Sequence, residues 1–510
     1  MISRRRLLQL LAAAIPASRA RSVLGFGQEY NQIRPGPFKG TRESLAAYSA
    51  PQWFRDAKFG IWAHWGPQSA IEYGDWYARL MYIQGERQYK YHVEHYGHPS
   101  KFGYKDTIPS WKAEKFDPDY LLGLYKKAGA KYFVSMGVHH DNFDLWNSKH
   151  TRWNSVNMGP HKDIVGMFRN ATAKQGLRFG VSEHLAMSYK WFSVAHGSDK
   201  EGTLASVPYD GQDPKYADLY HDIKDVYTKL EWNLDGTSEA FKRHWFMRIK
   251  DLVDNYEPDL LYTDGLIPFE NWGLSLVAHF YNVSRKGSSP QGVYTSKRLE
   301  DCRTGTCVLD VERGVVDQIW PEPWQTDTCI GNWHYLKGAT YKTPKMVIDM
   351  LVDIVSRNGN LLLNFPLPSS GMLDQQELKI LDEITRWMAV NQEAIHETRP
   401  WKIYGEGPST QVSSSEPGFN ESKRKPLGAK DIRFTKKGQT LYAFFMGWPE
   451  GRVSISALGP TSKLPAGKIG KVELLGSKHQ LKWAQDAEEL TVELPVERPC
   501  EHACVLRIGF

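Results

Sequence analysis

Short apolar runs alternate with amphipathic stretches along most of the chain. This alternation is typical of parallel strands joined by helices, and we predict an α/β barrel from it. The predicted strands cover residues 59–64, 132–138, 178–182, 260–264, 292–295 and 360–364.

Polar or ionisable residues stand at the ends of several of these runs. The carboxyl ends of parallel barrel strands meet at one rim, where active sites are built. We therefore expect these side chains to converge on one rim: His64, His139, His140, Glu183, Asp264 and Asn364.

Amphipathic stretches between the strands predict helices over residues 117–128, 238–255, 343–356 and 375–393. The first has a clear beginning, because Asp117 can cap it and Pro118 suits the first helical position.

The pattern changes near residue 405, where β-prone pieces begin to alternate with turns rich in Gly, Pro and Ser. Such spacing predicts a small antiparallel sandwich. Its expected strands lie at 431–435, 440–445, 452–456, 472–475, 490–494 and 504–508, and the polar segment 405–426 is expected to be the loosest part.

A chain of 510 residues is too long for one hydrophobic core. We divide it into an export signal (1–20), a lead-in segment (21–44), a barrel (45–404) and a C-terminal sandwich (405–510). The signal is basic, then apolar, then rich in small residues, and Ser3-Arg4-Arg5 favours the twin-arginine route. We expect a periplasmic or extracellular protein.

Composition adds little beyond this. The formal charge is +6, but four arginines lie in the expected signal, so we expect no nucleic-acid partner. No later segment approaches the ~20 apolar residues of a membrane span. The 18 Trp and 25 Tyr favour carbohydrate weakly, because aromatic faces suit the apolar faces of sugar rings.

The five cysteines are closely spaced in two places. Local disulfides 302–307 and 500–504 are possible in an oxidising compartment, and Cys329 would then be left over. A zinc site is disfavoured, because no histidines stand nearby at ligand spacing.

Two carboxylates are candidates for chemistry. Asp264 follows an apolar strand and precedes Gly265, so it should leave the sheet where a ligand can approach; the alternative is a capping or turn residue. Glu312 lies in a loop-like stretch, and its alternative is a surface ion pair with Arg313. Glu322 is the nearest competitor.

Adjacent histidines follow one predicted strand. His139-His140-Asp141 resembles a metal triad, but neighbouring side chains at a strand end should point to opposite sides. We therefore expect no metal, and imidazoles that bind sugar hydroxyls are the better interpretation; a buried structural histidine remains the alternative. His64, which precedes Trp65, offers the same chemistry.

A series of collinear motifs resembles the α-L-fucosidases, glycoside hydrolase family 29. They include Gly74-Asp-Trp, Gly137-Val-His-His-Asp, Tyr262-Thr-Asp-Gly and Val311-Glu-Arg-Gly. The full set covers residues 53–66, 74–82, 131–146, 259–265, 311–314, 323–332 and 352–364, so the resemblance spans roughly 45–405.

This resemblance implies an irregular (β/α)8-like, TIM-type barrel followed by a C-terminal β-sandwich. It implies an exo-acting, retaining α-L-fucosidase without a cofactor, in which Asp264 is the nucleophile and Glu312 the acid/base. The substrate would be a fucosylated glycan or oligosaccharide. The implied substrate-binding residues are His64, Asp75, Trp76, His139, His140, Glu183, Arg298 (or Lys297) and Trp324.

Two positions depart from the family pattern, since Asp75 stands where Glu is common and Glu183-His184 where Tyr-Ser is common. Both changes affect the expected sugar pocket, so an α-L-galactosidase of the same family is one alternative. An inactive sugar-binding relative and a metal-dependent hydrolase built on His139 and His140 are the others. The linkage, the aglycone and the oligomeric state stay open.

Overall fold

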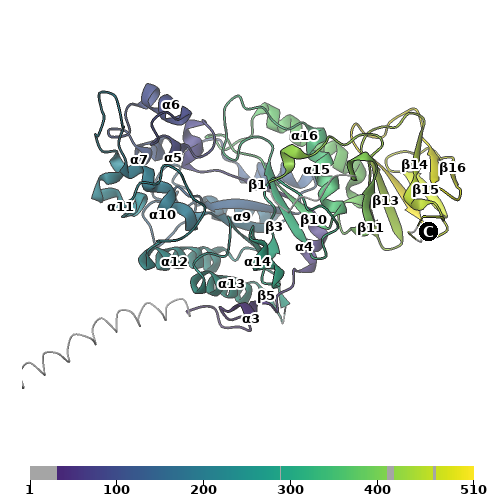
Figure 1. Cartoon of the computed structure of the whole chain (residues 1–510), viewed down its shortest axis with the longest axis horizontal. Coiled ribbons are helices and arrows are strands. Elements are labelled where there is room, and N and C mark those ends of the chain that lie inside the picture. The colour runs from purple at the N-terminus through teal and green to yellow at the C-terminus, as the bar shows by residue number, and fades with distance from the viewer. Residues whose placement is uncertain (1–31, 288, 411–418, 463, 465–466) are drawn as a thin grey trace, which may run out of the picture.

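A computed structural model describes residues 32–287, 289–410, 419–462, 464 and 467–510. The expected export signal and the start of the lead-in segment lie outside the described residues. Within them the chain forms a parallel barrel followed by two antiparallel sheets, as we predicted (Figure 1).

The described barrel sheet runs in the order β8-β7-β4-β3-β2-β1-β10-β9. A parallel bridge between Asp310 and Gln325 joins its two ends, which brings β8 against β9. The strands are β1 (Phe59–Ala63), β2 (Tyr132–Val138), β3 (Arg178–Glu183), β4 (Leu260–Thr263), β7 (Val293–Ser296), β8 (Val308–Leu309), β9 (Trp324–Cys329) and β10 (Gly359–Asn364).

These strands are apolar runs because helices cover the outside of the sheet and side chains fill the inside. Every residue of β1 and of β2 is buried, which explains their lack of polar alternation. Sequence patterns did not predict β8 or β9. The first has two residues, and the second contains the polar run Gln325-Thr-Asp-Thr.

Helices surround the barrel: α8 (Pro118–Lys127), α9 (Ile164–Gln175), α12 (Glu239–Tyr256), α13 (Asn271–Val283), α14 (Leu299–Arg303), α15 (Pro344–Ser356) and α16 (Gln375–Asn391). The predicted cap of α8 is confirmed, since the Asp117 side chain accepts from the Tyr120 amide. Ser238 caps α12 in the same way, and Thr343 caps α15. Short helices in the loops include α4 (Gln52–Ala57), α5 (Tyr77–Leu80) and α6 (Arg87–Tyr96).

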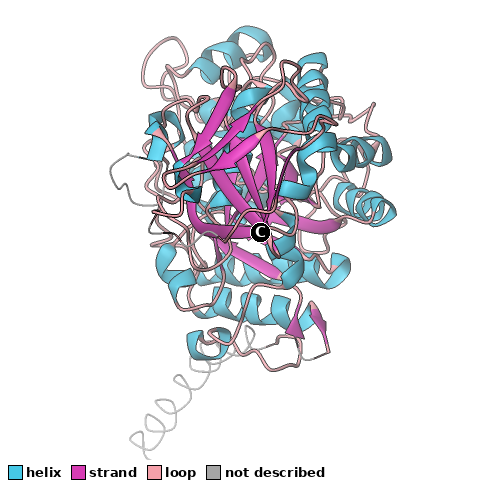
Figure 2. Cartoon of the chain, turned by 90° about the vertical axis from the view of Figure 1, so that its right-hand side faces the viewer, coloured by secondary structure: helices cyan, strands magenta, loops and turns pink. Residues whose placement is uncertain are grey.

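The C-terminal part is a sandwich whose described strands form two sheets around a second core (Figure 2). One sheet has the order β11-β12-β13-β18-β15 and the other β14-β17-β16. The strands are β11 (Arg399–Glu406), β12 (Ile432–Lys437), β13 (Thr440–Phe445), β14 (Arg452–Ile455), β15 (Lys471–Leu474), β16 (Trp483–Gln485), β17 (Leu490–Glu493) and β18 (Cys504–Gly509). Because β11 pairs with β12, the sheet begins before residue 405.

Helix α15 joins the two parts, since it packs against β11 and β12. At this contact the buried carboxylate of Asp353 is paired with three guanidinium groups, those of Arg357, Arg424 and Arg433. Arg433 comes from β12, so the ion cluster ties the sandwich to the barrel.

The cysteines follow the expected pairing in part. Cys302 and Cys307 form a disulfide. The Sγ atoms of Cys500 and Cys504 lie 3.2 Å apart without a bond, and Cys329 is free and buried. None of the helices in the described ranges is both long enough and apolar enough to span a bilayer.

Candidate active site

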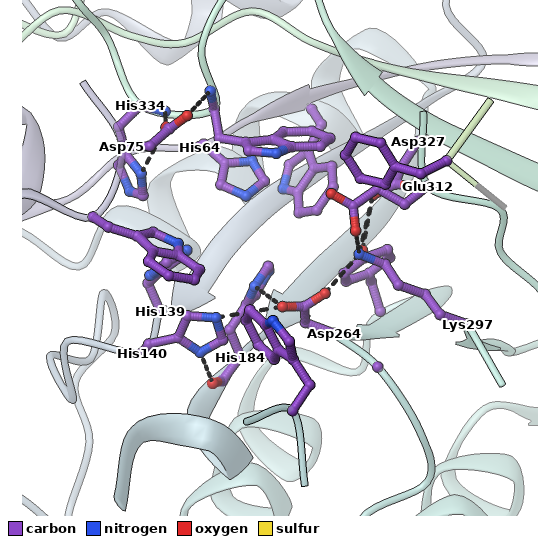
Figure 3. A pocket seen from close by; sticks show the side chains of 17 residues that line it. His64, Asp75, His139, His140, His184, Asp264, Lys297, Glu312, Asp327 and His334 are labelled. Atoms are coloured by element: carbon purple, nitrogen blue, oxygen red, sulfur yellow. Dashed lines mark hydrogen bonds and ion pairs between the residues drawn. The ribbon is translucent and has the colours of Figure 1, made fainter. Parts of the chain in front are cut away.

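A cavity of about 500 Å³ opens at the carboxyl ends of the barrel strands (Figure 3). Its size falls in the range of small-ligand sites. Its charged and imidazole lining consists of His64, Asp75, His139, His140, His184, Asp264, Lys297, Glu312, Asp327 and His334, and its aromatic lining of Trp62, Trp76, Trp232, Tyr262, Trp333 and Phe419.

Two of the reactive side chains stand at the ends of neighbouring barrel strands. Asp264 directly follows β4 and Lys297 directly follows β7. Gly265 turns the chain away after Asp264 with φ +100°, a backbone conformation that side chains rarely adopt. Its carbonyl accepts from the Lys297 amide at 2.6 Å, which fixes the two strand ends against each other.

The Lys297 ammonium joins the two predicted catalytic carboxylates. Its Nζ atom lies 2.7 Å from Oδ1 of Asp264 and 2.5 Å from Oε2 of Glu312 (Figure 3). A third carboxylate, Asp327, lies 3.7 Å from the same nitrogen. The structure therefore brings Asp264 and Glu312 together, whereas Glu322 is exposed and paired with Arg55.

The surroundings shift the pKa values of Asp264 and Glu312 in opposite directions. Burial opposes ionisation of Asp264, but the Lys297 charge and the nearby imidazoles of His140 and His184 hold its pKa well below the usual range. Burial raises the pKa of Glu312; Asp327 and Asp264 add to this, against the opposing effect of Lys297. One group is thus set up to be ionised and the other to hold a proton.

Three buried imidazoles form the floor of the cavity. Burial lowers the pKa of His184 to about 4 and moves those of His64 and His139 well below 6.5. They are therefore neutral at neutral pH. His64 Nδ1 and His184 Nε2 are buried and have no hydrogen-bond partner among the described residues.

The prediction that His139 and His140 point to opposite sides is wrong. Because β2 ends at Val138, strand alternation stops before them, and both rings line the cavity with centroids 4.5 Å apart. Two histidine groups are accordingly close enough to hold a metal ion: His64 with His139 and His184, and His140 with His184 and Asp264. Neutral imidazoles in this arrangement suit sugar hydroxyls equally well.

Asp75 has two roles in the site. Its carboxylate lines the cavity and accepts from the backbone amides of Trp333 and His334, at 3.1 and 2.6 Å. It thus anchors the loop after β9, while Trp76 presents its ring to the cavity beside His140.

Three predicted substrate-binding residues lie outside the cavity lining. Glu183 is buried behind it, where it accepts from Trp245, Thr263 and the Leu185 amide; burial raises its pKa to about 7. Trp324 is buried and donates to the Arg357 carbonyl. Arg298 is exposed beside Glu300, and its neighbour Lys297 enters the cavity instead.

Family comparison agrees with this geometry. The family model described as alpha-L-fucosidase matches residues 26–393, and that described as the alpha-L-fucosidase C-terminal domain matches residues 425–509. The chain belongs to the α-L-fucosidase family. It is therefore a glycoside hydrolase.

Similar family members cover nearly the whole chain. The tissue alpha-L-fucosidases of Mus musculus and Homo sapiens are 28% and 27% identical, over 93% and 92% of this chain and 95% and 91% of their own. A Thermotoga maritima α-fucosidase in complex with a mechanism-based inhibitor is 25% identical, with a TM-score of 0.71, over 93% of this chain and all of that one.

Sequence reasoning missed several members of the fucosidase cavity. His184 was noted only beside Glu183, as a departure from the family pattern; it directly follows β3, so the strand-end rule could have selected it as a site residue. Trp62 and Tyr262 lie inside buried strands and carry no separate signal. Trp232, Trp333, His334 and Phe419 come from loops, whose position no local pattern predicts.

Proposed function

We propose that the chain is an exo-acting, retaining α-L-fucosidase, which removes terminal α-L-fucose from glycoconjugates or oligosaccharides through a covalent fucosyl-enzyme. In this proposal Asp264 is the nucleophile and Glu312 the acid/base. Family membership supports the choice of sugar, and one solved relative is a Thermotoga maritima α-fucosidase in complex with fucose.

The observation that carries the proposal is the shared contact of both carboxylates with Lys297 Nζ. The two oxygens can be no farther apart than the sum of 2.7 and 2.5 Å. That limit falls within the ~5–5.5 Å separation of retaining enzymes and below the ~6.5–9.5 Å of inverting ones.

The electrostatics favour the same roles. Ionised Asp264 attacks the anomeric carbon while Glu312 gives its proton to the departing oxygen, and Glu312 then removes a proton from the water that releases fucose. Lys297 keeps the nucleophile ionised and oriented. The neutral imidazoles of the floor exchange hydrogen bonds with the sugar hydroxyls.

The shape of the cavity supports exo action. His64, His139 and His184 are at most 6% exposed at its floor, whereas Trp232 and Phe419 are 56% and 61% exposed in its lining. A cavity with a buried floor and an exposed margin admits one terminal sugar and leaves the rest of the substrate outside.

The direct test is release of p-nitrophenol from the α-L-fucoside and the α-L-galactoside, with and without chelator. We expect fucoside turnover that the chelator leaves unchanged, and NMR detection of α-L-fucose as the first product. Initial β-anomer would contradict retention. Turnover of the galactoside alone would mean that L-galactose, and not L-fucose, is the sugar that the enzyme removes. A loss of turnover with chelator would favour a metal ion at the histidine groups.

We also propose export by the twin-arginine route, from the Ser3-Arg4-Arg5 pattern. Replacement of Arg4 and Arg5 by Lys should leave the uncut chain in the cytoplasmic fraction. Normal processing of that variant would contradict this route.

A further inference from the structure

A segment that follows the barrel takes part in the active site. Residues 419–424, here called the clasp, run along the loop that carries Glu312. Within the clasp, Phe419 lines the cavity and is 61% exposed. Because most of this ring is exposed and is not packed in the core, its face is available to a ligand.

The clasp is fixed to the loop that carries Glu312 by hydrogen bonds to the main chain of Arg313 and Val315. The Glu421 amide donates to the Arg313 carbonyl at 2.8 Å. The Asn420 side chain accepts from the Val315 amide at 3.2 Å and donates to the Val315 carbonyl at 2.9 Å. Phe419 therefore has a defined position relative to Glu312.

The far side of the clasp is anchored to the barrel by charge. The Glu421 carboxylate accepts from the Thr328 hydroxyl at 2.7 Å and pairs with the Lys342 ammonium at 2.7 Å. Arg424 pairs with buried Asp353. Because these partners lie on β9, on the loop before α15 and on α15 itself, the clasp is held against the rim of the barrel.

The position of the acid/base decides which part of a substrate meets Phe419. Glu312 must lie beside the oxygen that leaves, so the leaving group lies on the Glu312 side of the cavity. Arg313, the next residue, places its guanidinium 5.9 Å from the centre of the Phe419 ring and 5.7 Å from that of Trp333. Phe419 and Trp333 thus flank Arg313 on the leaving-group side.

The chemistry of this corner suits a sugar. Arg313 itself lines a second cavity, beside α15, and its Nη2 atom donates to Cys329 Sγ and the Gly331 carbonyl, so the rings of Phe419 and Trp333 face the first cavity in its place. Two aromatic rings that line the cavity, those of Phe419 and Trp333, match the apolar face of a pyranose ring.

We infer that Phe419 and Trp333 form the subsite for the leaving group, and that its occupant is a sugar residue. This inference rests on the proposed function. The subsite is contributed in part by the clasp, so the part of the chain after the barrel takes part in substrate selection.

The test compares kcat/KM for three kinds of fucoside: the fluoride, which is too small to reach Phe419, the p-nitrophenyl glycoside, and a panel of regioisomeric fucosyl disaccharides. For Phe419→Ala we expect the ratio of the best disaccharide to the fluoride to fall about tenfold, which corresponds to the upper range of one aromatic contact. Phe419→Trp keeps a flat face and should keep the ratio near wild type.

The matched control is Tyr120→Ala, an aromatic residue on α8 that is 50% exposed and does not line the cavity. Its ratio should equal that of the wild type. An unchanged ratio in Phe419→Ala would overturn the subsite, and a fall for the p-nitrophenyl glycoside alone would overturn its assignment to a sugar. No wild-type turnover of the fluoride would instead overturn the proposed function, and the subsite with it.

Discussion

The Lys297 ammonium lies 2.7 Å from the Asp264 carboxylate, in a site where burial alone would neutralise an acid. The same ammonium lies 2.5 Å from Glu312. The charge of Lys297 thus favours the ionised form of both carboxylates; it holds the pKa of Asp264 low, whereas burial keeps the pKa of Glu312 raised against it.

Lys297→Met should raise the pKa of both carboxylates, because each loses the positive charge that favours its ionised form. The acid limb of the pH profile of kcat/KM reports ionisation of Asp264, and the basic limb reports deprotonation of Glu312. Both limbs should therefore move to higher pH, and kcat/KM at the wild-type optimum should fall roughly 10²-fold. Lys297→Arg, which keeps the charge, should leave the limbs near their original positions; equal shifts in both variants would contradict this account.

Asp264→Ala should lower kcat on the p-nitrophenyl fucoside by a factor on the order of 10³–10⁴, since the covalent step is lost. Azide should restore part of the rate by taking the vacated place of the carboxylate. A fucosyl azide in the product mixture would identify the missing group as the nucleophile. Unchanged turnover would exclude Asp264 from that role.

Glu312→Ala should slow fucosides with poor leaving groups far more than activated aryl fucosides, because only the former need a proton. The control is Glu322→Ala, whose side chain is 73% exposed and 3.1 Å from Arg55, away from the cavity. That variant should behave as the wild type on every substrate. A leaving-group dependence in Glu322→Ala would transfer the acid/base role to it.

Asn420→Ala should reproduce part of the Glu312→Ala pattern, because it frees the loop that carries the acid/base. The substitution leaves the buried amide and carbonyl of Val315 without partners, at a cost of about 1–3 kcal/mol in the local structure. We expect a larger fall in kcat for poor leaving groups than for activated ones. Ser422→Ala, an exposed change in the same segment, is the control, and an equal fall on all substrates would indicate a merely structural role.

Asp353→Asn should destabilise the joint between barrel and sandwich by about 3–5 kcal/mol, since it leaves three guanidinium groups around a neutral residue. Burial opposes the charge of Asp353, but the three arginines depress its pKa overall. Its stabilising effect is therefore present at neutral pH and is lost as the pH falls below the ordinary carboxylate range, near ~3.9, towards the folded pKa. Thermal unfolding across this pH range should show it, and Asp382→Asn, from an exposed pair with Arg386, should change little.

The architecture could be predicted from the sequence, because a strand that is buried on both faces is a continuous run of apolar residues. Strands β2 and β13 were predicted at their observed bounds, and the caps Asp117 and Ser238 begin α8 and α12. The sequence also selected Asp264, through its position after a strand and through a family motif, and Glu312, through a family motif alone. These features are local in the chain, so a linear pattern can carry them.

The assembly of the site depends on contacts between residues that are far apart in the chain. Lys297 was an alternative to Arg298 in the sequence, and the turn after β7 selects which of the two adjacent cations enters the cavity. His139 and His140 share the cavity because β2 ends one residue before them. Phe419 and Glu312 line the same cavity although more than a hundred residues separate them in the chain. The contacts of Asn420 and Glu421 hold them there, and no local sequence pattern predicts such long-range contacts.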